Sequence, residues 1–473
     1  NASGDGNVFI GKCAGYCYND TGLIAIGDQV GASQRSGNYN IYFGKCVAST
    51  VACNNTSGFN FGAGFGVLKG VTTGSCNVAI GYEALSGAVT GGSNVAFGRN
   101  AGGSSMTGSD NTAIGRCSMN GTVTGANNIA MGCKAAINLS SGADNIALGQ
   151  LALGTGTVTG DDNIALGESA GTGMTSGHHN IMLGNCAGRY QETGTYNALF
   201  GTAAGISMRG SYNVAFGSWA LQGSSTCTNN TGGCNIALGK STGKGMTSGT
   251  NNILTGCRAA YNITTGSDNI ALGQLALGAG TVTGSYNIAF GFESGCAITS
   301  GTTQILIGKY AGKGTQTGQD NVYMGRYSGC ATSTGSYNVA IGANTMIGSG
   351  IKTGNTTLGR FAGCAITAAQ YNTFLGYGAG HHTTTGCYNI AIGCAVCLSA
   401  NSASTELAIG CGASRWICGD SSFNVCLAGS TIKAIASGGI FCATSFVGSG
   451  ANLTGINAGF DPDAQENLYA GTN

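Results

Sequence analysis

The residues of this chain that could do chemistry are few and dispersed. Histidine occurs only in two adjacent pairs, which are His178-His179 and His381-His382. A metal site needs several convergent ligands, whereas adjacent side chains on a strand point to opposite faces. We therefore interpret both pairs as exposed turn residues and expect no metal and no cofactor.

The 21 cysteines are spread over the whole length. Cys394 and Cys397 form a C-A-V-C pair, but no second pair follows at the spacing of a zinc ribbon. Cysteine is also too sparse for a disulfide scaffold. The pattern favours reduced cysteines that act as small apolar filler.

A third candidate is a row of tyrosines, each of which directly precedes an asparagine. Aromatic faces stack on sugars, so these side chains are candidate contacts to a receptor glycan; the alternative is that they pack across a seam between subunits. The residues of this row that we select are Tyr286, Tyr337, Tyr371 and Tyr388.

Composition limits which elements could position these residues. The chain has 473 residues, including 88 glycines and one proline, Pro462. Hydrophobic residues make up 42% and charged residues 8%, which argues against disorder, and the lack of proline argues against collagen. The net charge of +1 gives no basic footprint for nucleic acid. No run of about 20 apolar residues is present, so we expect no membrane span.

One repeat organises the glycines, and it reads Asn-(Ile/Val)-Ala-(Ile/Leu/Phe/Met)-Gly. With its Asn as position 0, the motif recurs in 25 units between residues 7 and 424, mostly 17 residues apart. Position 0 is Asn in 21 units and position +4 is Gly in 24. The exceptions at position 0 are Leu23, Gly58, Gln304 and Glu406.

Seventeen residues suit two short strands and two turns, which is one coil of a solenoid. We therefore predict an all-β fold, a parallel β-solenoid of about 25 coils that forms an elongated homotrimeric fibre. The asparagines would stack into a hydrogen-bonded ladder along the axis, for which Asn111, Asn128, Asn145, Asn163 and Asn180 are representative. Glycines at +4 would form corners with positive φ, as at Gly115, Gly132, Gly149, Gly167 and Gly184. The Gly that recurs at −3 is expected to do the same at the turn before the motif.

The alternation of the strand also suggests which residues point inward. The large apolar residues at +1 and +3, such as Ile146 and Leu148, share one face and are expected to point into the coil. Position +2, which is mostly alanine, would then lie outside. Because both faces are apolar, we expect the outer face to pack on another copy, most simply around a three-fold axis.

Three segments are predicted. Residues 1–429 form the repeat rod, with a protruding loop between Leu221 and Gly233 that contains Cys227. Residues 430–456 form a short β-structured linker or stem, and residues 457–473 a linker and the start of a further repeat block.

The motifs NIALGQLALG, NVFIGKCAG, NIMLGNCAG and NTFLGYGAG, followed by SFVGSGANLTGI, resemble repeat regions of bacteriophage tail-fibre proteins. The Cys-bearing variants and the ending ENLYAGTN are most similar to structural repeat proteins of marine cyanophages. More distantly, the repeat resembles the YadA-like heads of trimeric autotransporter adhesins. The resemblance implies a trimeric virion fibre and brings no catalytic motif.

We therefore expect a non-enzymatic fibre that serves as a rigid spacer or adhesin shaft in host attachment, on a virion or as an extracellular filament. Its partners would be further copies of itself and a host surface glycan or other receptor. The alternative is a secreted bacterial surface filament or trimeric adhesin. A minor alternative is an ice-binding solenoid, because T-x-T occurs at 122–124, 157–159 and 281–283.

The period of the apolar residues within the repeat bears on an enzymatic alternative. Left-handed β-helix acyltransferases also stack Gly-rich coils, with an aliphatic residue at every sixth position. Ile146, Ala152 and Val158 follow that period, but the unit of Asn180 places Thr193 there. The pattern therefore disfavours this class of enzyme.

Overall fold

The structure is a computed structural model that describes residues 5–32, 34–49, 55–223, 230–314, 317–331, 334–422 and 425–427. The chain divides into a long unit, Asn1–Cys426, and a short unit, Leu427–Asn473. The predicted linker 430–456, the segment 457–473 and Cys227 with its loop tip lie outside the described residues.

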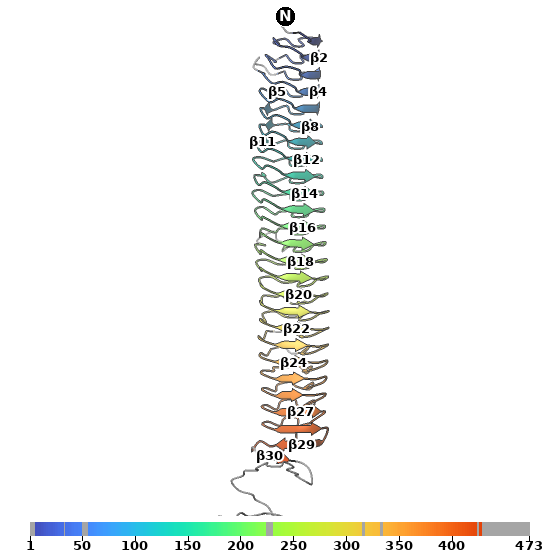
Figure 1. The fold of residues 1–473 in the computed structure, drawn as a ribbon, viewed down its shortest axis with the longest axis vertical. Helices are drawn as coiled ribbons and strands as arrows, with labels where there is room; N and C mark the ends of the chain where they lie inside the picture. Colours follow the sequence, from blue (N-terminus) through green and yellow to red (C-terminus); the bar gives the residue numbers. More distant parts are fainter. Residues whose placement is uncertain are drawn as a thin grey trace, which may run out of the picture. The chain divides into compact units, whose positions relative to one another are not determined.

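The long unit is a rod of stacked coils, each contributing one main strand to a continuous sheet along one side (Figure 1). Every regular element among the described residues is a β-strand. The strands of the main sheet in its first half are β1 (Val8–Ile10), β2 (Ile24–Asp28), β3 (Ile41–Lys45), β4 (Phe61–Phe65), β6 (Val78–Tyr82), β8 (Val95–Phe97), β10 (Thr112–Ile114), β12 (Ile129–Met131), β13 (Ile146–Leu148), β14 (Ile164–Leu166), β15 (Ile181–Leu183), β16 (Ala198–Phe200) and β17 (Val214–Phe216). In its second half they are β18 (Ile236–Leu238), β19 (Ile253–Thr255), β20 (Ile270–Leu272), β21 (Ile288–Phe290), β22 (Ile305–Ile307), β23 (Val322–Met324), β24 (Val339–Ile341), β25 (Thr356–Leu358), β26 (Thr373–Leu375), β27 (Ile390–Cys394), β28 (Leu407–Cys411), β29 (Ser414–Gly419) and β30 (Val425–Leu427).

Consecutive main strands pair in parallel and in register, so equivalent positions stack directly on one another. Ile146 of β13 lies opposite Ile164 of β14, which in turn lies opposite Ile181 of β15. The predicted parallel β-solenoid with a 17-residue repeat is therefore confirmed, with about 23 turns. The parallel stack has fewer turns than the 25 coils expected, because β28 is followed by an antiparallel partner, β29, which ends it.

The register of one unit was predicted wrongly. The motif was placed at Gly58, but Phe61 pairs with Val78 and the backbone N–H of Asn60 donates to Asn40 Oδ1 at 2.8 Å, so Asn60 occupies position 0. The preceding coil is correspondingly longer. The sequence GFNFGAGFG offers two Gly residues at plausible corners, and only the pairing of the strands distinguishes them.

The inward face of the main strand is the opposite of the one expected. Position +2 is fully buried along the rod, as at Ala147, Ala165 and Ala215, whereas +1 and +3 are half-buried or exposed. The +2 row packs against large side chains from the other wall of the coil, such as Val123 and Leu153, so it is mostly alanine, and the larger aliphatic residues at +1 and +3 lie outside. The +2 alanines therefore cannot form the surface between copies that was predicted from them.

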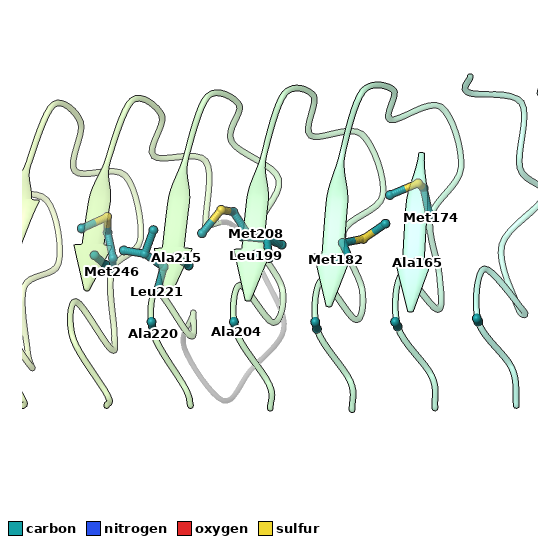
Figure 2. Packing of buried hydrophobic residues seen from close by; sticks show 14 of the residues in the cluster. Ala165, Met174, Met182, Leu199, Ala204, Met208, Ala215, Ala220, Leu221 and Met246 are labelled. Atoms are coloured by element: carbon teal, nitrogen blue, oxygen red, sulfur yellow. The ribbon is translucent and has the colours of Figure 1, made fainter. Parts of the chain in front are cut away.

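Large side chains do enter the interior where a glycine faces them. Met182 at +2 lies beside Gly188 at +8, and a Cβ added to Gly188 would sit 2.5 Å from Met182 Sδ. Likewise, a Cβ added to Gly329 at +8 would sit 2.5 Å from Cδ2 of Tyr323 at +2. Where +2 is alanine, position +8 is a large residue in some coils, such as Leu153 beside Ala147. In others it is glycine, such as Gly171 beside Ala165, and Leu153 and Met182 of the neighbouring coils fill the space. The interior thus keeps its volume by pairing large with small residues, and Figure 2 shows the resulting row of methionines, leucines and alanines.

The remaining wall of the coil carries a second, weaker ladder. Its four short parallel strands are β5 (Gly70–Val71), β7 (Ala88–Val89), β9 (Ser105–Met106) and β11 (Thr122–Val123). Farther along the rod, isolated bridges such as Leu139 to Val158 and Ile263 to Val282 continue this ladder. Their inward side chains, for example Met106 and Val123, are buried against the main strand's +2 row.

Candidate interaction surfaces

The five asparagines selected from the repeat lie in one buried column. Within it, each side chain joins the coil before to the coil after. Asn145 Nδ2 donates to Asn128 Oδ1 at 3.1 Å and to Gly160 O at 3.0 Å. Its Oδ1 accepts from the backbone N–H and from Nδ2 of Asn163, both at 3.0 Å. The same pattern links Asn111, Asn128, Asn163 and Asn180.

This column satisfies a backbone donor that would otherwise be unpaired inside the protein. Where the preceding position 0 is Asn, the N–H of position 0 donates to that side-chain oxygen rather than to a carbonyl, as Asn145 N–H does to Asn128 Oδ1 at 2.9 Å. Burying such an N–H without a partner would cost about 1–3 kcal/mol. Units in which position 0 is not Asn keep part of this hydrogen-bonding pattern. The N–H of Leu23 still donates to Asn7 Oδ1 at 2.8 Å, and Gln304 Nε2 still donates to Gly318 O at 2.8 Å.

The five glycines selected at +4 have positive φ. The values at Gly115, Gly132, Gly149, Gly167 and Gly184 are +120°, +139°, +132°, +135° and +131°. At Gly149 a Cβ would also lie 2.6 Å from Gly167 O of the next coil. Both the backbone conformation and the close approach of neighbouring coils therefore require glycine there.

The glycines at −3 have a different origin from the one predicted. At Gly125 and Gly160 the backbone does not have positive φ, but an added Cβ would lie 1.9 Å from the carbonyl oxygen of the equivalent glycine in the next coil. The residue with positive φ before the motif is instead the one at −1, such as Asp144 at +56° and Tyr286 at +62°. Close stacking, not a left-handed turn, thus explains the −3 glycine.

The four selected tyrosines project from these −1 corners. Tyr286, Tyr337, Tyr371 and Tyr388 are 63%, 55%, 49% and 60% exposed. Tyr371 and Tyr388 stack on each other with ring centroids 5.2 Å apart, so each covers one face of the other. The hydroxyl of Tyr337 accepts from Gln319 Nε2 at 2.7 Å.

The outer face of the main sheet presents a long apolar surface. The +1 and +3 side chains form two columns on it, and several are strongly exposed, such as Phe216 at 60%, Phe97 at 54% and Ile10 at 57%. Parallel sheets are normally covered on both faces, and contiguous exposed apolar patches mark sites of interaction. Sequence reasoning missed this surface because it assigned these residues to the interior.

The cysteines occupy the surface and the turns rather than a common site. Cys17 is disulfide-bonded, whereas the other cysteines whose side chains are described have free thiols. Burial raises the pKa of the Cys296, Cys330 and Cys364 thiols, which keeps them protonated at neutral pH. These three therefore behave as unreactive filler.

Among the described residues, one charged side chain, Lys352, is fully buried inside the rod. Lys352 replaces the usual −3 glycine; its Nζ donates to Met346 O at 2.8 Å and also to Gly348 O. Burial lowers the pKa of Lys352 to about 7. Lysine is nearly always exposed, so its residue type does not predict this burial; its place at the −3 position of the repeat is the one signal for it.

The two histidine pairs differ in their surroundings. His179 lies 3.4 Å from Asp162 Oδ2 and stacks on Tyr196 at 4.7 Å. His381 and His382 instead lie within reach of Cys397, which comes from the next coil. The expectation that adjacent histidines diverge is wrong at this second pair, because the chain bends there and brings the ring centroids to 3.9 Å.

The fold and its surfaces define a β-solenoid repeat protein. No protein-family model matches the chain, and no curated protein or solved structure matches it either. The described part of the chain contains no helix long and apolar enough to cross a membrane.

Proposed function

We propose that this chain is the shaft of a virion fibre, such as a phage tail fibre, and acts as a rigid spacer in host attachment. The observation that carries the proposal is the unbroken parallel stack of about 23 turns with one apolar outer face. Such a stack resists bending because each coil is hydrogen-bonded to both neighbours. The repeat's resemblance to phage tail fibres supports a location on the virion.

Self-association follows from the outer face. At a strand spacing of about 4.8 Å, the stack presents a sheet roughly 110 Å long and about 10 Å wide. That is on the order of 1,100 Å² per chain, enough for a stable interface between copies. A three-fold arrangement would cover this face on every copy at once, and a homotrimer is therefore the assembly that we propose.

Two measurements test this proposal. Mass photometry of the purified chain should give the mass of three copies, and a stable monomer at micromolar concentration would refute the assembly. Immunogold electron microscopy should then place the rod on virions. Label confined to a bacterial surface would support the second candidate, a secreted filament or trimeric adhesin of the same construction.

An adhesive role is favoured by the exposed tyrosines. Tyr286 and Tyr337 stand at −1 corners three coils apart, with exposed Thr303 and Asp320 at the corners between them. Aromatic faces and adjacent polar groups are the chemistry that binds sugars. We infer that this row contacts a host glycan.

The double substitution Tyr286→Ala and Tyr337→Ala tests the glycan contact. Loss of cell or glycan binding with an intact assembly would support it. Loss of the assembly itself would instead place the tyrosines in a seam between copies. The control is Tyr16→Ala, which removes an exposed tyrosine outside the −1 row and should leave both binding and assembly as in the parent.

A further inference from the structure

A histidine pair and a cysteine from two consecutive coils converge near the end of the parallel stack. His381 and His382 follow β26, and Cys397 follows β27. The backbone N–H of Gly380 donates to Val396 O at 2.9 Å, which fixes the two coils against each other at this point. The juxtaposition therefore comes from the repeat itself.

The three side chains present their ligand atoms to a common point. Cys397 Sγ lies 3.8 Å from His381 Nδ1 and 3.9 Å from His382 Nδ1, and the three atoms all lie within 4.8 Å of one another. A tetrahedral zinc ion has Zn–N bonds of about 2.0–2.1 Å and Zn–S bonds of about 2.3 Å. Its ligand atoms are thus roughly 3.4–3.6 Å apart, so small side-chain rotations would complete the geometry.

We propose that His381, His382 and Cys397 form a binding site for a transition metal ion of the zinc class. Two imidazoles and a thiolate are the ligand set that such borderline and soft ions prefer over Mg²⁺ or Ca²⁺. Binding releases the Cys397 thiol proton to solvent. His381 Nδ1 also exchanges its 2.7 Å contact with Gly378 O for the metal.

The surroundings leave room for an ion to enter and for a fourth ligand. His382 is exposed, whereas His381 and Cys397 are half-buried. A surface hollow lined by Phe361, Cys364, Tyr377, Gly378 and Ala395 adjoins His381. Water can therefore complete a tetrahedral shell, and the bound ion would staple the coil of Asn372 to that of Asn389.

The other histidine pair provides an internal contrast. The His178 and His179 rings are 5.5 Å apart and nearly perpendicular, at 84°. Within the described residues, the only group of three or more such ligands is that of His381, His382 and Cys397. If any adjacent histidine pair sufficed to bind the metal, both pairs would bind it. The proposed site predicts binding at His381-His382 only, because only that pair has a cysteine beside it.

The test is Co²⁺ titration of the reduced, full-length protein, followed by competition with Zn²⁺. One equivalent of Co²⁺ should give a thiolate-to-cobalt charge-transfer band and the intense visible bands of tetrahedral coordination, both removed by Zn²⁺. Cys397→Ser should abolish the charge-transfer band. His381→Ala or His382→Ala should weaken binding at least tenfold, since losing even an outer-shell partner costs about 10–100-fold.

Two matched controls separate this site from the protein's many other thiols. Cys394→Ser removes an exposed thiol three residues away, and the double variant His178→Ala, His179→Ala removes the other pair; both should bind Co²⁺ as the parent does. The proposal is overturned if Cys397→Ser retains the band, or if Cys394→Ser loses it equally. Circular dichroism of each variant must match the parent, so that unfolding cannot imitate ligand loss.

Discussion

Replacing Gly149 by alanine tests the explanation of the corner glycines. Gly149 has φ of +132°, and a Cβ there would lie 2.6 Å from Gly167 O. An ordinary carbon–oxygen contact is about 3.3–3.6 Å, so the two coils must separate locally by nearly 1 Å. The change therefore acts on the stacking of β13 on β14.

The expected magnitude comes from two terms. Holding a non-glycine residue in such a backbone conformation costs about 1–3 kcal/mol. The separation also stretches two hydrogen bonds between the coils, from Ile146 N–H to Asn163 O and from Gly167 N–H to Leu148 O, both 2.8 Å. Each is worth about 1 kcal/mol, which brings the local destabilisation to about 3–5 kcal/mol.

Hydrogen–deuterium exchange is the suitable assay, because a long solenoid can open locally while the rest stays folded. A loss of about 3 kcal/mol should speed exchange of the Ile146 and Gly167 amides by roughly 100-fold or more. The control is Gly66→Ala. Gly66 has φ of +63°, and an added Cβ would meet only Glu83 Cγ, at 3.3 Å.

The control should cost only about 1 kcal/mol, because the equivalent +6 position holds Glu83 and Asn100 in other coils at φ of 52° and 55°. If Gly149→Ala left exchange at these amides within twofold of the parent, the close approach of coils would not be what requires glycine at +4. Equal effects of the two substitutions would lead to the same conclusion.

Three further predictions follow from the ladder, the buried lysine and the outer face. Asn145→Ala should destabilise its coil by about 3 kcal/mol, because it leaves the Asn163 N–H buried without its acceptor. Hydrogen exchange at the Asn163 amide measures this loss. The control is Asn138→Ala, at an exposed asparagine that donates to Thr155 O, and it should cost under about 0.5 kcal/mol. The pKa of Lys352 falls from 10.5 to about 7 in the folded state, so the unfolded state binds more protons between these two values. The free energy of unfolding should therefore rise with pH across this window, by up to about 1.4 kcal/mol per pH unit. Denaturant unfolding from pH 7 to 10 should show this rise in the parent relative to Lys352→Met, and parallel curves for the two proteins would contradict it. Replacing Val214 and Phe216 of the outer face by lysine should yield monomers in mass photometry while leaving the circular dichroism spectrum unchanged, and persistence of the larger species would exclude this face as the interface.

The repeat made much of the fold predictable. Asparagine at 0 and glycine at +4 recur so regularly that only stacked, nearly identical coils explain them, and the parallel register of Ile146, Ile164 and Ile181 agrees. The register was ambiguous only where a coil carried extra residues and a second glycine, before Asn60. Local spacing defines a coil, but the pairing of neighbouring coils decides which residue is equivalent to which.

The inward face could not be obtained from alternation alone. Alternation shows that Ile146 and Leu148 share a face and that Ala147 lies on the other, but it does not say which face is inside. The rule that large apolar residues are buried fails for this strand because the large residues inside the coil, such as Leu153 and Val123, come mostly from other positions, and the +2 row that they pack against is mostly alanine. One signal did exist: where +2 is large, position +8 is small, glycine beside Met182 and Tyr323 and alanine beside Tyr42, and this pairing identifies +2 as interior.

The histidine–cysteine cluster could also have been found from the sequence. In a coil of 17 residues, residue i lies beside residue i+17, so the neighbour of Gly380 is Cys397, next to the His381-His382 pair. The C-x-x-C spacing identifies only ligands that lie close together along the chain. Ligand sets in a solenoid are instead expected at offsets near the repeat length, plus or minus one residue.

The apolar outer face bears on what holds the rod together. Inside the coils, large side chains such as Leu153, Met174 and Val123 are fully buried, and each contributes about 1.5–3 kcal/mol. The alanines of the +2 row add about 0.8 kcal/mol per buried methyl group, whereas ordering each residue of a coil costs about 1–2 kcal/mol. Burying an isoleucine or phenylalanine at +1 or +3 would contribute about a further 1.5–3 kcal/mol each. A substantial share of the hydrophobic stabilisation available to this sequence thus lies on its outer face, and that share is realised only when another copy covers the face.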